Sequence, residues 1–153
     1  MISVVIPTLN DERRLTAALA PLVPAAMEGL VREVVVVDGG STDGTFEIAD
    51  DAGARFLRSD ADAAQRIAEG VRASRGPWVL ILDPRVRLDF GWESAALKHL
   101  NAFRTPARFR LQRGEGGWLM RLTPPKATAL LRMKDGGQSP GATRWLDARG
   151  WVE

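Results

Sequence analysis

The segment Glu33–Thr45, EVVVVDGGSTDGT, joins a run of four valines to an abrupt series of aspartate, glycine and hydroxyl residues. A continuous β-branched run is typical of a strand that is buried on both faces of a parallel sheet. This strand should end at Asp38, at the carboxyl edge of the sheet, where open α/β folds bind ligands. Asp43 precedes the next apolar pattern, so we expect it to cap the following helix, with Glu47 in the first turn.

Apolar runs and helical spacings alternate along residues 1–82. Short apolar runs predict strands at residues 2–6, 33–37, 55–57 and 78–82. Between them, apolar residues at helical spacing predict three helices, with buried faces in residues 15–22, 46–49 and 64–71. Pro21 and Pro24 should kink or restart the first helix. The β-α-β-α-β-α-β order predicts a three-layer α/β fold in which helices cover both faces of a mainly parallel sheet.

The patterns beyond residue 82 are weaker. Residues 89–103 have the spacing of another helix, and residues 108–112, 118–122 and 127–133 have the character of short strands. The tail, residues 135–153, is rich in glycine and poor in periodicity, which predicts a loop or a mobile end. At 153 residues, the whole chain has the length of one domain.

Composition argues against several classes of protein. No apolar run approaches the ~20 residues that span a bilayer, and the apolar start of the chain lacks a basic region, so we expect a first strand and not a signal peptide. The chain has no cysteine, which excludes disulfides and thiolate chemistry and agrees with a cytoplasmic protein. A single histidine, His99, argues against a histidine-rich metal site and a Ser-His-Asp triad.

The net charge of +2 is unevenly distributed. Residues 1–75 hold 8 Lys or Arg against 12 Asp or Glu, whereas residues 76–153 hold 13 against 7. The basic half is compatible with contact to phosphates, to a nucleic acid or to the anionic inner face of a membrane. The alternative is a set of solvated surface arginines. We expect no nucleic acid partner and keep a peripheral membrane contact as an open alternative.

Two aspartates directly follow predicted strands. Asp38 ends the valine run, and Asp83 ends the strand at residues 78–82. The carboxyl ends of parallel strands meet at one edge of a sheet, so these carboxylates should lie near Thr8 and Asn10, which follow the first strand. We therefore expect a binding site at this edge of the sheet.

Three blocks in this order resemble the N-terminal half of the family-2 glycosyltransferases, which have the GT-A fold. The blocks are ISVVIPTLNDE, VVVVDGGSTDGT and VLILDPRVRLDFGW, all within about residues 1–103. The resemblance is to small bacterial members and implies a single GT-A-like domain. Its nucleotide-binding half would be residues 1–103, followed by short acceptor-side strands in residues 104–134 and the tail. Similar enzymes are longer, which implies a truncated C-terminal half.

The resemblance implies a site for a nucleotide-diphospho-sugar that carries UDP or GDP. The residues implied along the nucleoside are Pro7, Thr8, Asn10 and Asp11. Asp38 would accept a hydrogen bond from the base, and Arg66 would contact a phosphate. Each of three residues also has a structural alternative. Asp38 would instead accept bonds from loop N–H groups, Asn10 would cap a helix, and Arg66 would be a surface residue of its helix.

The third block departs from the family's pattern. Similar enzymes carry an Asp-x-Asp signature whose last carboxylate binds a divalent ion, whereas this chain reads Asp83-Pro84-Arg85. Asp83 alone makes only a weak site for Mg²⁺ or Mn²⁺, which bind through carboxylate oxygens. Either Arg85, together with Arg87, replaces the metal as the cation facing the diphosphate, or the protein has lost this chemistry. A third interpretation is that both arginines point outward from a short strand as solvated charges.

Two functions from different classes follow from this resemblance. The first is transfer of a sugar to an unknown acceptor by direct displacement, with inversion at the anomeric carbon. The second is a catalytically degenerate protein that binds a nucleotide or a partner protein without turnover. No acidic pair follows residue 75, so no catalytic base is assigned, and Glu115, Asp135 and Asp147 are isolated candidates. A nucleotidyltransferase-like protein is a third interpretation, but the glycine-rich basic loop expected after its first strand is absent from this sequence.

Overall fold

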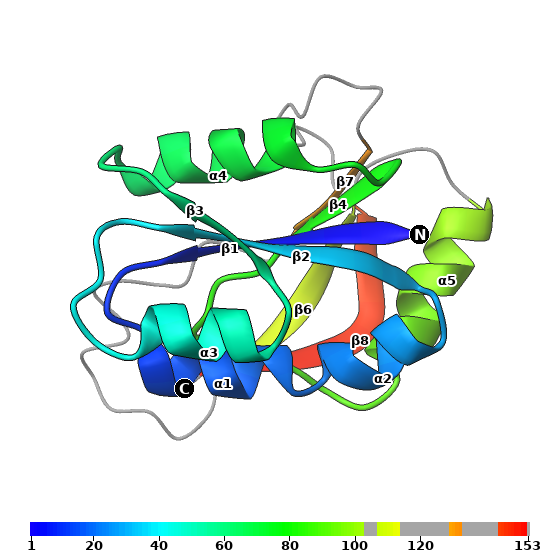
Figure 1. Cartoon of the computed structure of the whole chain (residues 1–153). Coiled ribbons are helices and arrows are strands. Elements are labelled where there is room, and N and C mark those ends of the chain that lie inside the picture. The colour runs from blue at the N-terminus through cyan, green and yellow to red at the C-terminus, as the bar shows by residue number, and fades with distance from the viewer. Residues whose placement is uncertain (103–106, 114–128, 133–143, 153) are drawn as a thin grey trace.

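The computed structural model describes residues 1–102, 107–113, 129–132 and 144–152 as a mixed α/β fold (Figure 1). The strands are β1 (Ile2–Thr8), β2 (Val31–Asp38), β3 (Arg55–Arg58), β4 (Trp78–Ile81), β5 (Val86–Leu88), β6 (Ala107–Arg113), β7 (Ala129–Arg132) and β8 (Arg144–Val152). The helices are α1 (Glu12–Leu19), α2 (Leu22–Met27), α3 (Thr45–Asp51), α4 (Ala63–Ala73) and α5 (Trp92–Ala102). Within these described ranges, no helix has the length and apolar character needed to cross a bilayer.

The described strands form one sheet in the order β3-β2-β1-β4-β7-β6-β8-β5. The first four strands in this order pair in parallel, which confirms the mainly parallel sheet predicted for residues 1–82. β7 and β6 continue the sheet antiparallel, β8 runs parallel to β6, and β5 pairs antiparallel with β8. Thr8 is the register partner of Asp38, so the carboxyl ends of β1 and β2 lie level.

Helices lie on both faces of the parallel strands (Figure 1). On one face, α4 packs against β1 and β2, over an apolar cluster that includes Val5, Val35 and Val37. On the other face, α1 and α2 pack over a larger cluster that includes Val4 and Ile6. Burial on both faces explains why the strand sequences are continuous apolar runs, since each fully buried valine or isoleucine contributes about 1.5–3 kcal/mol of stability.

Helix α4 approaches the sheet most closely at Gly70, which is buried. A Cβ atom at this position would overlap Val5 Cγ1 and lie 3.0 Å from Val37 Cγ2. The helix begins after Asp62, whose Oδ1 accepts hydrogen bonds from the N–H groups of Ala64 (2.8 Å) and Gln65 (2.9 Å). The N-cap sets where α4 begins, and the close contact at Gly70 lies on the face of the helix that is turned to the sheet.

The prediction that prolines restart the first helix is confirmed. α1 ends at Leu19, and α2 begins at Leu22 after Pro21. Pro24 lies in the first turn of α2, where a missing N–H removes no intrahelical hydrogen bond. The predicted helix at residues 89–103 is also confirmed, as α5.

The prediction of a loop for the tail was wrong at Arg144–Val152, which forms β8 between β6 and β5. Pairing with strands distant in sequence overrides the weak local pattern of this segment. The strands expected at residues 108–112 and 127–133 are confirmed by β6 and β7, which covers residues 129–132. The strand expected at residues 118–122 lies outside the described residues.

Candidate functional site

The loops that follow β1 and β4, together with the start of α4, enclose a cleft of about 410 Å³ at the carboxyl edge of the parallel strands. Its lining consists of Pro7, Thr8, Leu9, Asp11, Arg14, Ala63, Arg66, Ile67, Ile81, Asp83, Pro84 and Arg85. Six of the eight residues expected from the sequence are therefore brought together here, and Asn10 and Asp38 are not in the lining. The cleft lies at the edge of the sheet where we expected a binding site from the sequence.

Asp38 is fully buried at the end of β2, outside the lining of the cleft, and its carboxylate accepts four hydrogen bonds. Its Oδ1 accepts bonds from the hydroxyls of Thr8 (3.1 Å) and Ser41. Its Oδ2 accepts bonds from the backbone N–H groups of Gly40 (2.9 Å) and Ser41 (2.8 Å). These contacts match the structural alternative for Asp38, in which its carboxylate accepts bonds from loop N–H groups. Asp38 thus supports the floor of the cleft through Thr8.

Burial and hydrogen bonding act in opposite directions on the pKa of Asp38. Burial raises this pKa, but the bonds from Ser41, Gly40 and Thr8 together outweigh burial and hold it below the ordinary value of 3.8. The carboxylate is therefore ionised at neutral pH, and the negative charge is stabilised by the loop that follows β2.

Asn10 connects the β1–α1 loop to the β2–α3 loop. Its backbone is in the left-handed region, with φ of 53°, a conformation that asparagine adopts more readily than most residues. Its N–H donates to Ser41 Oγ (2.7 Å), and its side-chain Oδ1 accepts from the N–H of Thr42 (2.9 Å). The alternative that Asn10 caps a helix was wrong, because Asp11 is the N-cap residue of α1, and the asparagine side chain bonds across to the neighbouring loop.

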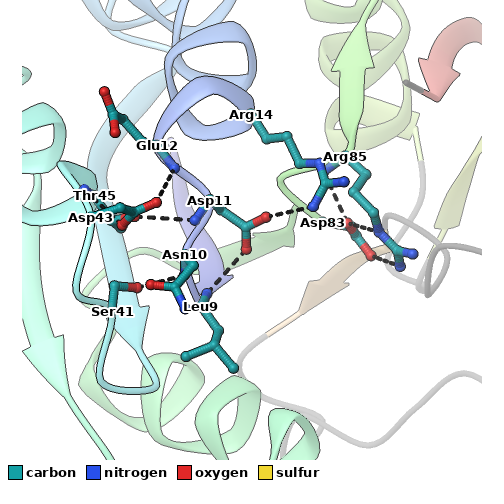
Figure 2. A network of polar contacts seen from close by, with 10 residues as sticks. All are labelled: Leu9, Asn10, Asp11, Glu12, Arg14, Ser41, Asp43, Thr45, Asp83 and Arg85. Carbon is teal, nitrogen blue, oxygen red and sulfur yellow. Dashed lines mark hydrogen bonds and ion pairs between the residues drawn. The ribbon is translucent and has the colours of Figure 1, made fainter.

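A second set of contacts between the same loops surrounds Asp43 (Figure 2). Asp43 Oδ2 accepts from the N–H of Glu12 (3.1 Å), while Glu12 Oε2 accepts from the N–H of Gly44 (3.2 Å). Thr45 Oγ1 donates to Asp43 Oδ1 (2.5 Å) and accepts from the N–H of Asp11 (3.1 Å). The Thr45 hydroxyl is the main cause of a lowered pKa at Asp43. The prediction of Asp43 as N-cap was wrong by one residue, since Gly44 holds that position.

Asp11 and Arg14 form an ion pair on one wall of the cleft. Arg14 Nη1 lies 3.1 Å from Asp11 Oδ1, and Asp11 Oδ2 accepts from the N–H of Leu9 (3.0 Å). Arg14 is half exposed, with 52% of its side chain accessible, whereas Asp11 is largely covered. Arg14 was absent from the predicted site. Its spacing of three residues from Asp11, at the start of an expected helix, is the signal that could have identified it.

Asp83 and Arg85, in the loop that follows β4, form a two-pronged ion pair beside the Asp11–Arg14 pair (Figure 2). Arg85 Nε lies 3.0 Å from Asp83 Oδ1, and Arg85 Nη2 lies 2.7 Å from Asp83 Oδ2. The backbone N–H of Arg85 also donates to Asp83 Oδ1 (2.9 Å). The hydrogen bonds to the Asp83 carboxylate raise the pKa of Arg85. The negative charge of Asp11 also raises this pKa, whereas partial burial of the guanidinium lowers it.

The suggestion that Arg87 acts beside Arg85 does not match the geometry. Arg87 lies on β5, is exposed, and lines a separate cleft of about 710 Å³ next to Phe90. Arg85, with 21% of its side chain accessible, points into the first cleft, so the alternative that both arginines are solvated charges is wrong for Arg85. Arg85 lies in the turn that precedes β5, whereas Arg87 lies on the strand itself, and the two side chains line different clefts.

Arg66 reaches the cleft from the first turn of α4 and is partly buried, so it is not a simple surface residue of its helix. Its Nη1 donates to the backbone carbonyl of Ala61 (3.0 Å). Its Nε is buried without a hydrogen-bond partner among the described residues. Gly39 makes room for this guanidinium, because a Cβ atom at Gly39 would overlap Arg66 Nη1 and lie 2.8 Å from Arg66 Cζ.

The contact between Gly39 and Arg66 predicts a coupled effect on stability. Gly39→Ala should lower the free energy of unfolding by about 1 kcal/mol at most, because the added methyl group displaces a guanidinium at the end of a flexible side chain. The same substitution in an Arg66→Ala background should cost almost nothing, which urea unfolding of the four variants measures as a double-mutant cycle. An equal cost of Gly39→Ala in both backgrounds would show that Arg66 does not occupy this position.

Curated relatives are similar to about half of the chain. Glycosyltransferase AglJ of Haloferax volcanii is 34% identical over 84 residues, which are 54% of this chain and 26% of that protein. The PGL/p-HBAD biosynthesis glycosyltransferase of Mycobacterium bovis is 34% identical over 95 residues, covering 54% of this chain and 34% of that protein. These alignments thus span about a quarter to a third of the length of these curated relatives.

Solved structures with the same fold are also known. Glucosyl-3-phosphoglycerate synthase from Mycobacterium tuberculosis, in complex with Mn²⁺, UDP and phosphoglyceric acid, superposes with a TM-score of 0.68 at 20% identity, covering 88% of this chain and 56% of that chain. S. aureus TarS 1-349 superposes with a TM-score of 0.72 at 16% identity, covering 99% of this chain and 57% of that chain. These likenesses confirm the predicted GT-A fold. The model of glycosyl transferase family 2 matches residues 3–133, and the chain therefore belongs to this family.

Proposed function

We propose that the cleft binds a nucleotide-diphospho-sugar and that the protein transfers the sugar to an acceptor. The observation that carries this proposal is the convergence of six predicted site residues on one cleft at the carboxyl edge of the sheet. Proteins of the same fold bind related ligands, since glucosyl-3-phosphoglycerate synthase has been solved with Mn²⁺ and UDP-glucose and TarS with UDP. The donor would be linked to UDP or GDP.

The charges of the cleft suit a diphosphate. Its described lining contains three arginines, Arg14, Arg66 and Arg85, against two aspartates, Asp11 and Asp83, so these residues carry an excess of one positive charge. Guanidinium groups bind phosphate oxygens through two parallel N–H bonds, and the partial burial of Arg66 and Arg85 reduces screening by water. We assign the phosphates to this arginine side of the cleft.

The nucleoside would lie along the edge of β1. Pro7, Thr8 and Asp11 present this edge to the cleft, with Leu9 beside them. Asn10 and Asp38 contribute indirectly, because Asn10 connects two loops and Asp38 holds Thr8 from below. A direct hydrogen bond between Asp38 and the base would require one of its present partners to move.

The proposed chemistry is direct displacement at the anomeric carbon. A hydroxyl oxygen of the acceptor forms the new bond to this carbon while the bond to the diphosphate oxygen breaks, which inverts the centre and releases the nucleoside diphosphate. The arginines would stabilise the negative charge that develops on the leaving diphosphate. The base that takes the hydroxyl proton is unassigned, and the candidates Glu115, Asp135 and Asp147 fall outside the residues whose side chains are described.

Calorimetric titration of the whole chain with UDP, GDP and their sugar conjugates tests the binding step. We expect one nucleotide to bind and Arg66→Ala to weaken its binding about tenfold, which corresponds to the loss of one charge-assisted contact. Arg72→Ala is the matched control, since Arg72 lies exposed at the last turn of the same helix. No binding of any of these ligands, or an equal loss in both variants, would contradict the proposal.

The second candidate function is nucleotide binding without turnover. The observation that favours it is the replacement of a signature carboxylate by Arg85. Slow hydrolysis of the bound sugar nucleotide, with water as the acceptor, would distinguish a working transferase from a protein that only binds. We keep the cytoplasm as the proposed compartment, in agreement with the absence of cysteine, and contact with the inner face of the membrane as part of the proposal.

A further inference from the structure

We infer that Arg85 is a built-in counter-charge for the donor diphosphate, so that this cleft binds its nucleotide without a divalent ion. Asp83 then acts as a positioning residue for Arg85 and not as a metal ligand. This inference rests on the proposed function. In contrast, glucosyl-3-phosphoglycerate synthase, a protein of the same fold, has been solved in complex with Mn²⁺.

The oxygens of Asp83 fit a divalent ion poorly. Oδ1 accepts two bonds from Arg85, through its backbone N–H (2.9 Å) and Nε (3.0 Å), and Oδ2 accepts one from Nη2 (2.7 Å). Mg²⁺ or Mn²⁺ would have to displace the guanidinium and then remain close to its fixed positive charge, which is electrostatically unfavourable.

Among the described residues that line the cleft, Asp11 is the other acidic group, and it does not compensate for this. Asp11 already accepts bonds from Arg14 and from the N–H of Leu9. Across the part of the chain that the structure describes, no three Asp, Glu, His or Cys side chains gather closely enough to hold a metal ion. The acidic side chains of the cleft therefore favour a cation supplied by the protein itself over a bound metal ion.

The backbone holds Arg85 in a fixed place. Val86 N–H donates to the carbonyl of Asp83 (2.8 Å), which closes a turn with the buried Pro84 at its second position, where proline's restricted φ suits the turn. The Asp83 carboxylate then orients the guanidinium from one side. A phosphate would approach this partly buried guanidinium from the side away from Asp83, and Arg85, which is already oriented, would lose little side-chain entropy on binding.

The charge on Arg85 is also permanent. The bond to Asp83 raises the pKa of a group that is already protonated at all ordinary pH values, so the counter-charge does not titrate. A bound metal ion, in contrast, is lost to chelators and at low pH. Nucleotide binding should therefore be insensitive both to chelation and to moderate acidity on the protein side.

Titration of the whole chain with UDP and GDP, in Mn²⁺ and in EDTA, tests this inference. We expect the wild-type dissociation constant to agree within about twofold between the two conditions, and Arg85→Ala to weaken binding about tenfold in both. Arg85→Asp creates a pair of carboxylates around Pro84, so its nucleotide binding should be weak in EDTA and recover with Mn²⁺. Circular dichroism confirms that each variant is folded.

Two further measurements sharpen the result. Arg87→Asp makes the same change of charge two residues away, in the separate cleft, and should leave nucleotide binding independent of metal. Asp83→Asn should weaken binding equally in Mn²⁺ and in EDTA if Asp83 positions Arg85, whereas a metal ligand would show its effect only in Mn²⁺. Titration with Mn²⁺ alone should detect binding to the Arg85→Asp variant and not to the wild type.

The outcomes separate this inference from the proposed function. Wild-type binding that tightens about tenfold or more with Mn²⁺ overturns the built-in counter-charge and leaves nucleotide binding intact. Absence of binding to UDP and GDP under both conditions overturns the proposed function and, with it, this inference. Metal-independent binding that Arg85→Ala does not weaken also overturns the role of Arg85.

Discussion

Replacing Asp38 by asparagine is expected to lower the free energy of unfolding by about 3 kcal/mol at neutral pH. The carboxylate is fully buried and accepts four hydrogen bonds, two from hydroxyls and two from backbone N–H groups. An asparagine of the same size offers one carbonyl oxygen, and its NH₂ group would face donors. At least one buried donor then loses its partner, which is the costly case for a hydrogen bond.

This difference between wild type and Asp38→Asn should depend on pH in a defined direction. The folded-state pKa of Asp38 lies below the ordinary value of 3.8, so ionisation contributes its full stabilisation above that value. The contribution is lost as the pH falls through the lower, folded-state pKa, and the two proteins should converge in stability there. Urea unfolding over a pH series measures this effect. Asp50→Asn, at an exposed position of α3, is the control. A difference that stays constant down to low pH would mean that the charge of Asp38 is not what stabilises the loop.

Gly70→Leu is the second substitution with a large expected effect, a loss of about 3 kcal/mol or more. Even a Cβ atom at Gly70 overlaps Val5, and a leucine would push α4 away from β1 and β2. Gly70→Ala should also destabilise the protein, by about 1 kcal/mol, because an overpacking cost of about 1–3 kcal/mol exceeds the gain in helix propensity of about 1 kcal/mol.

The control for this prediction is Ala64→Leu, at an exposed position of the same helix. It introduces a leucine without a core contact and should change stability by no more than about 0.5 kcal/mol. Displacement of α4 would also move Arg66, so Gly70→Leu should weaken nucleotide binding, while Ala64→Leu should not. A stable Gly70→Leu protein would contradict the described packing of α4 on the sheet.

The parallel half of the fold could be predicted because its strands carry their own signal. Val35 to Val37 are buried against helices on both faces, and this double burial is what makes the run continuous in sequence. The level ends of β1 and β2 then bring Thr8 and Asp38 together, as strand order alone predicted. β8 could not be predicted, because it is stabilised by pairing with β6 and β5, and its irregular local pattern carries little trace of such distant partners.

The position of the site could be predicted from the sequence, but the hydrogen bonds and ion pairs between its residues could not. Asp11, Asp83 and Arg85 could be placed at the cleft from their positions after strands. Residue type alone does not distinguish Arg14 from the other arginines, and its spacing of three residues from Asp11 is the one signal in the sequence that points to it. The bond from Asn10 to Thr42 is equally invisible in sequence, because it requires a left-handed residue and a neighbouring loop 32 residues away.

The reciprocal bonds between the β1–α1 and β2–α3 loops have a consequence for how such proteins diverge. Asn10 Oδ1 accepts a hydrogen bond from the N–H of Thr42, and Glu12 Oε2 accepts one from the N–H of Gly44. In return, Asp43 Oδ2 accepts one from the N–H of Glu12. Neither loop can be replaced alone without leaving donors or acceptors of the other unmatched. A chimaera that inherits one of these loops from a relative should therefore fold and bind poorly, while one that inherits both should behave as a parent does. The two loops form a single unit of exchange, although more than twenty residues of sequence separate them.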